Sequence, residues 1–148
     1  MRFAILMSLT LTTVACTGDD TDVTDTDPQG ATFAFTMTGT GYDPHAAKGV
    51  HIALTDDAGA LVDTRLVDIT DGGWTYEATD ALAEGAAYSV SWYADMSEDP
   101  GCDAFAQDGT TVVDHVWKKA IPAVTADVTM THAHGTDFDP NGCDAFAE

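Results

Sequence analysis

The chain has 148 residues, 45% of them hydrophobic, and its 25 acidic residues against 5 basic ones give a formal net charge of −20 at pH 7. A field of that sign disfavours nucleic acid and anionic lipid surfaces as partners, and it favours cations and basic surfaces. Of the acids, 21 are Asp, a residue of turns and a common calcium ligand in loops, although surface acid that keeps an exported protein soluble explains the same composition.

The first fifteen residues have the composition of an export signal. Arg2 supplies one positive charge, and an apolar stretch without any acid follows it. Such a stretch, roughly a dozen residues, matches a signal-peptide core and is too short to span a bilayer. It ends in Thr13-Val14-Ala15-Cys16, which resembles the lipobox of bacterial lipoproteins, with Thr13 where that family usually has Leu. The resemblance implies cleavage of residues 1–15, lipidation of Cys16 and anchoring in the cell envelope, at the outer membrane rather than the inner one. An ordinary secretory signal with an incidental cysteine is the alternative.

Residues 16–30 follow as a predicted disordered, acidic tether behind the lipidated cysteine. Five acids, no base and a single Val provide too little apolar surface to offset the entropy of ordering. Repulsion among the aspartates extends such a segment. The remaining residues, 31–148, suffice for one domain with one core.

Alternation of apolar and polar residues dominates from residue 31 onward and predicts strands. The alternating runs are Thr32–Thr38, Val50–Thr55, Leu61–Val67, Trp74–Glu77, Tyr88–Tyr93, Thr111–Lys118 and Val124–His132. Gly- and Asp-rich turns separate them, and only Ala81–Glu84 favours a single helical turn. About seven short strands in one domain predict an all-β fold, a single antiparallel two-sheet sandwich of the immunoglobulin-like or a related kind. The three tryptophans are expected in its core.

Residues 50–94 carry a more specific pattern. A hydrophobic strand, an Asp-Ala-Gly turn, a strand, an Asp-Gly-Gly turn and an aromatic strand are followed by Leu82-Ala83-Glu84-Gly85-Ala86-Ala87-Tyr88-Ser89-Val90. This order resembles transthyretin-like and carboxypeptidase-regulatory-like sandwiches. The resemblance implies an accessory or binding module, since those domains are mostly noncatalytic.

Two cysteines remain once Cys16 is set aside. Cys102 and Cys143 form an even pair in an oxidising compartment, which predicts a disulfide. Their flanks are similar, Asp99–Ala106 against Asp139–Ala147. We expect two loops of like build to pack around the bridge.

An acidic loop follows the strand that ends near Tyr93. Asp95, Ser97, Asp99 and Asp103 place several oxygen ligands within one irregular segment, as a calcium ion requires. The first three have the spacing that opens an EF-hand-like loop, but the glycine falls one place late and no Glu closes it. The segment is therefore a candidate calcium site, with a solvated acidic turn as the alternative.

The histidines offer a second candidate site. His132 and His134, two residues apart on a predicted strand, project to the same side. His45 or His115 would supply a third nitrogen for copper or zinc. The alternative is that the strand has ended by His132 and that both rings lie in solvent.

No catalytic residues are predicted. Asp114 and His115 point to opposite faces of any strand that contains both, and the serines lack the glycines of a nucleophile elbow. The leading prediction is a lipid-anchored, noncatalytic envelope module with a binding or structural role, stiffened by calcium if the acidic loop holds it. Its partners are the membrane, through the anchor, and an unidentified protein, carbohydrate or cation. Envelope copper or zinc binding is the alternative, and a hydrolase ranks third.

Overall fold

A computed structural model describes residues 30–96, 101–104 and 113–147 of the chain. The predicted signal, Cys16 and all of the predicted tether but its last residue lie outside this range. So do Ser97 and Asp99 of the candidate calcium loop. No helix among the described residues has the length and apolar character needed to cross a membrane.

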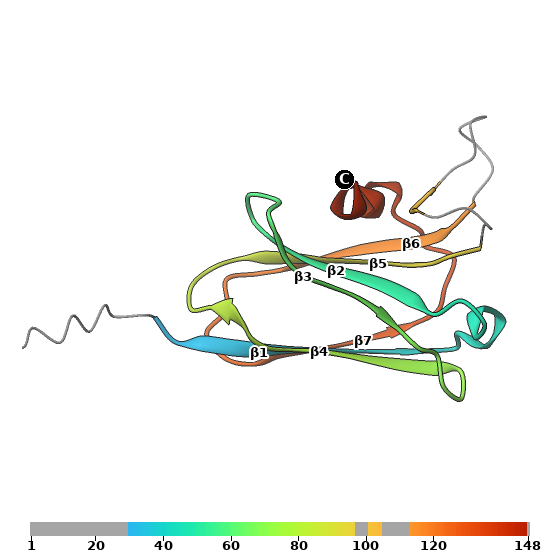
Figure 1. The fold of residues 1–148 in the computed structure, drawn as a ribbon. Helices are drawn as coiled ribbons and strands as arrows, with labels where there is room; N and C mark the ends of the chain where they lie inside the picture. Colours follow the sequence, from blue (N-terminus) through green and yellow to red (C-terminus); the bar gives the residue numbers. More distant parts are fainter. Residues whose placement is uncertain (1–29, 97–100, 105–112, 148) are drawn as a thin grey trace, which may run out of the picture.

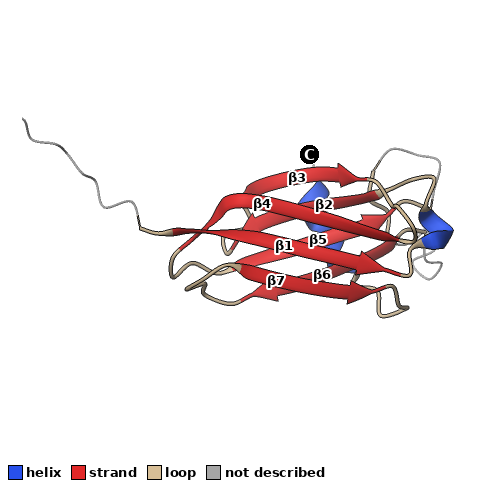
Figure 2. Cartoon of the chain, turned by 90° about the horizontal axis from the view of Figure 1, so that it is seen from below, coloured by secondary structure: helices blue, strands red, loops and turns tan. Residues whose placement is uncertain are grey.

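The described residues fold into two sheets packed face to face (Figure 1, Figure 2). One sheet has the order β4-β1-β7 and the other the order β3-β2-β5-β6. The elements are β1 (Thr32–Thr40), η1 (Asp43–His45), β2 (Val50–Asp56), β3 (Leu61–Val67), β4 (Gly73–Ala83), β5 (Tyr88–Ala94), β6 (His115–Ile121), β7 (Val128–Ala133) and η2 (Pro140–Phe146), where η marks a 3₁₀ helix. The predicted all-β, two-sheet sandwich is confirmed. One strand pair is not antiparallel. After β6 the chain crosses from the second sheet to the first, where β7 runs parallel to β1.

The alternating pattern places the core between the sheets. Phe35 and Met37 of β1 face Ile52 and Leu54 of β2 across this core, and all four are fully buried. The three tryptophans are at most 4% exposed, as expected of core residues. Burial of these large side chains supplies the main favourable term for folding.

Several sequence-based boundaries were wrong, and the largest difference is in β4, which spans Gly73–Ala83 where a strand was predicted only over Trp74–Glu77. Residues 81–83 of the predicted helical turn at 81–84 are instead the end of β4, and Glu84 lies in the turn that follows. Leu82 is fully buried opposite Phe33 of β1, so tertiary packing overrides helix propensity. Strand β6 begins at His115, so that Val113 and Asp114 of the predicted run Thr111–Lys118 precede it, and β7 begins at Val128 rather than at Val124. Just before β7, the Asp127 side chain accepts a hydrogen bond from the Ala34 amide of β1 at 2.9 Å. This side chain takes the place of the backbone carbonyl that a neighbouring strand would offer.

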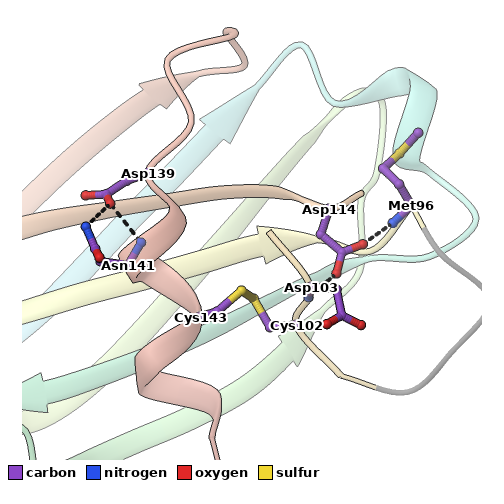
Figure 3. Close-up of a disulfide and its surroundings, with 7 residues drawn as sticks. All are labelled: Met96, Cys102, Asp103, Asp114, Asp139, Asn141 and Cys143. Atoms are coloured by element: carbon purple, nitrogen blue, oxygen red, sulfur yellow. Dashed lines mark hydrogen bonds between the residues drawn. A yellow bond between two sulfur atoms is a disulfide. The ribbon is translucent and has the colours of Figure 1, made fainter. Parts of the chain in front are cut away.

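The predicted disulfide joins Cys102, in the loop before β6, to Cys143 in η2 (Figure 3). Asp139 caps η2 by accepting a hydrogen bond from the Asn141 amide at 3.0 Å. The similar flanks of the two cysteines differ in conformation, since the Cys143 flank is helical and residues 101–104 are irregular. A glycine at 142 is required, because a Cβ there would lie 2.5 Å from Val116 of β6.

Candidate metal centre

Three histidines from separate parts of the chain meet at the end of the sandwich where β1 and β7 finish and β6 begins. His45 ends η1, His115 opens β6, and His134 follows the last residue of β7. His45 is 2% exposed, and the other two are half-buried. Because β6 and β7 belong to different sheets, the cluster joins the two layers.

Backbone contacts fix two of these histidines. After β1 the chain turns at Gly41, whose φ of 77° lies in the left-handed region that favours glycine. The buried Tyr42 then donates its amide to Gly72, and its carbonyl accepts from the His45 amide at 2.9 Å. The His134 amide donates to the Thr40 carbonyl at 2.8 Å, so that the residue stays bound to β1 after β7 has ended.

The three side chains converge on a single point. His45 Nε2 lies 2.9 Å from His134 Nε2 and 3.3 Å from His115 Nδ1, and the last two atoms are 3.1 Å apart. For metal–nitrogen bonds of about 2.0–2.1 Å, such separations give ligand angles of roughly 90–110°, the range of a tetrahedral or pyramidal site. Within the part of the chain that the structure describes, this is the one group of three or more His, Cys or acidic side chains arranged to hold a metal ion.

Hydrogen bonding alone does not satisfy this triangle. Each ring nitrogen either carries a hydrogen or presents a lone pair. Three nitrogens in mutual contact therefore include at least one pair of like kind, two hydrogens or two lone pairs, which repel. A cation that accepts all three lone pairs removes the conflict. In addition, His45 Nδ1 is buried and has no hydrogen-bond partner among the described residues.

The surroundings of the cluster favour the neutral form of its three histidines. Burial lowers the pKa of all three histidines below the ordinary value of 6.5. For His45 and His115, neighbouring histidines lower it further, and Asp114 partly opposes the shift of His115. Neutral imidazole is the form that binds a metal, so these shifts keep the lone pairs available near pH 7.

Aromatic rings enclose the cluster on its inner side. Phe138 stacks on His115 with ring centroids 4.4 Å apart, and Trp117 lies 5.3 Å from the His134 ring. The Tyr42 ring meets His134 edge-on at 5.0 Å. These contacts restrict the imidazole rotamers, which preorganises the three nitrogens.

His132, proposed from the sequence as a metal ligand, does not join the cluster. It lies in β7 and is 8% exposed, and its Nδ1 is 2.8 Å from the Tyr42 hydroxyl. That hydroxyl also accepts a hydrogen bond from Trp92 Nε1 at 3.0 Å. As predicted from strand alternation, His132 and His134 both contact the rings of Tyr42 and Trp117. His132 lies deeper in the core, however, and its Nδ1 is hydrogen-bonded to the Tyr42 hydroxyl.

Asp114 positions the segment that carries His115. Its carboxylate, in a side chain only 1% exposed, accepts hydrogen bonds from the Met96 amide at 2.9 Å and the Asp103 amide at 2.8 Å (Figure 3). Because Asp103 follows the disulfide-bonded Cys102, the bridge, this carboxylate and the start of β6 are mechanically linked. Asp114 itself lies before β6, so the alternation assumed for Asp114 and His115 does not apply.

The candidate calcium residues are placed only in part. The Asp95 carboxylate lies 3.9 Å from Lys48 Nζ. Asp103 is exposed and contributes its backbone to the Asp114 contacts. Since Ser97 and Asp99 lie outside the described residues, calcium binding by this loop stays a prediction.

Comparison with protein-family models, with curated proteins and with solved structures finds no match to this chain.

Proposed function

We propose that this chain is a lipid-anchored, noncatalytic binding module of the bacterial cell envelope, and that its ligand is a transition-metal ion held by His45, His115 and His134. The observation that carries the proposal is the convergence of three imidazole nitrogens within 2.9–3.3 Å of one another. Hydrogen bonds cannot satisfy all three pairs of nitrogens in such a triangle, whereas three ligands of one metal ion must converge in this way.

The ligand set favours zinc or copper over other metals. All three donors are imidazole nitrogens, which suit late first-row ions, whereas calcium and magnesium select oxygen. The disulfide removes Cys102 and Cys143 as thiolate donors. Nitrogen ligands generally bind Cu²⁺ more tightly than Zn²⁺, so we expect the higher affinity for Cu²⁺. We expect Zn²⁺ to match the tetrahedral or pyramidal geometry of the three nitrogens.

The proposed location has separate support. The disulfide is typical of oxidising compartments outside the cytoplasm, and residues 13–16 resemble a lipobox. The formal charge of −20 raises the local concentration of cations around the protein.

Metal titration of the purified full chain, made metal-free first, tests the proposal. We expect one equivalent of Zn²⁺ or Cu²⁺ to bind, with Cu²⁺ quenching the fluorescence of nearby Trp117. His134→Ala should lower the affinity by more than the 10–100-fold typical of losing an outer-shell partner. His51→Ala is the matched control, since His51 stacks on Tyr93 and is not part of the cluster. Equal affinity of wild type and His134→Ala would refute the site.

A further inference from the structure

The three-histidine cluster is one ligand short of a closed site. Nitrogens separated by 2.9–3.3 Å form a triangle too small to hold a metal in its plane, since the bonds would be compressed below the usual length of about 2.0 Å. An ion bound to all three nitrogens would therefore lie to one side of the plane that contains them. That position leaves its opposite face open to a fourth ligand.

The described residues do not provide that fourth ligand. No carboxylate or thiolate among them joins the three nitrogens in a common cluster. The Asp114 carboxylate, next to His115 in sequence, is held by the amides of Met96 and Asp103. Asp137 is the acid nearest in sequence after His134, and it is exposed to solvent.

Charge and access both point to a small ligand from solution. Three neutral imidazoles leave the full charge of a divalent ion uncompensated in a half-buried site, which favours an anion as the fourth ligand. His115 and His134 are half-buried rather than enclosed, so solvent reaches the cluster. On the inner side the rings of Tyr42, Trp117 and Phe138 pack against the histidines, so a fourth ligand would approach from the solvent side.

We propose that the metal centre keeps one exchangeable coordination position, filled by water or by a small monodentate anion from solution. This inference rests on the proposed metal binding. Three protein ligands plus one exchangeable ligand is the arrangement by which protein-bound zinc accepts exogenous molecules, whereas structural zinc sites are closed by four protein ligands. The chemical class of ligand is therefore small monodentate anions such as azide or hydroxide, because a single open position does not accommodate a chelating acid.

Cobalt substitution tests this directly, since Co²⁺ reports its coordination through visible d–d bands. The metal-free full chain is loaded with one equivalent of Co²⁺ and titrated with sodium azide. We expect a saturable change of the d–d spectrum with one azide per cobalt, and the same change in an Asp137→Asn variant. His51→Ala serves as a control for nonspecific binding of cobalt by histidine.

The outcomes separate the two proposals. A cobalt spectrum that azide does not alter would overturn the exchangeable position while leaving the metal site intact. A spectrum that Asp137→Asn changes, with azide then binding only to the variant, would overturn it too, because Asp137 would be the fourth ligand. Failure of the wild-type chain to bind cobalt, zinc or copper would refute the metal centre itself.

Discussion

Removal of the Tyr42 hydroxyl should destabilise the protein more than its small size suggests. This oxygen lies 2.8 Å from His132 Nδ1 and accepts from Trp92 Nε1 at 3.0 Å. Both partners are buried, Trp92 completely and His132 to all but 8%. Tyr42→Phe keeps the ring contacts with Trp74 and Trp117 but leaves two buried polar groups unpaired. At about 1–3 kcal/mol for each, the expected loss of unfolding free energy is about 2–6 kcal/mol.

Chemical denaturation of the metal-free protein measures this loss as a lower midpoint at unchanged slope. The matched control is Tyr88→Phe, whose hydroxyl accepts one hydrogen bond, from the Ala83 amide at 2.7 Å, at a partly buried position. The control should lose only about 1 kcal/mol. If Tyr42→Phe costs no more than Tyr88→Phe, the hydroxyl does not hold the network together and the reasoning fails.

Four further perturbations test other parts of the molecule. Replacement of Cys102 and Cys143 by Ser removes a cross-link between residues 41 apart, worth about 4 kcal/mol in the chain-entropy model, and an unchanged denaturation midpoint would contradict that value. Because burial lowers the pKa of the clustered histidines, the unfolded chain binds more protons than the folded one below about pH 6.5. The metal-free protein should therefore lose stability as the pH falls from there, and denaturation curves at a series of pH values will show whether it does. Cys16→Ser should abolish lipid labelling and release the chain from membranes, and equal membrane retention would count against the anchor. Calcium should raise the melting temperature more than magnesium does at equal ionic strength, and Asp95→Asn/Asp99→Asn should lose that excess; equal shifts from both ions would leave only an acidic surface.

The strands were predictable wherever one face of the strand is apolar and the other polar. Thr32–Thr38, Val50–Thr55 and Tyr88–Tyr93 lie within β1, β2 and β5, because each alternates between the core and the outer face of a sheet. Prediction failed where local pattern and tertiary packing disagree. Ala81–Glu84 has helical propensity, yet burial of Leu82 against β1 keeps residues 81–83 in β4. The parallel pairing of β7 with β1 depends on a crossover between sheets that no local pattern encodes.

The candidate site was predictable as a set of residue types and not as a geometry. Histidine is a common metal ligand, so His45, His115 and His134 were all candidates from sequence, as was His132. Which three converge depends on contacts over long sequence separations, such as the 89 residues between His45 and His134. Tyr42 was not identified as important, because a tyrosine in a loop gives no sign that its hydroxyl will meet Trp92 and His132 in the core.

We expect the histidine cluster to lower the stability of the metal-free protein. Three neutral imidazole nitrogens in mutual contact include one repulsive pair, and His45 Nδ1 is buried without a partner among the described residues. Local conflicts of this kind persist mainly at functional sites. A bound cation would convert the repulsion into three bonds and would stabilise the fold by RT ln(1 + [L]/Kd), about 2.7 kcal/mol at a hundred times Kd. His115 opens β6 in one sheet and His134 follows β7 of the other, so the same ion would also tie the two layers together, and metal binding should raise the stability of the sandwich.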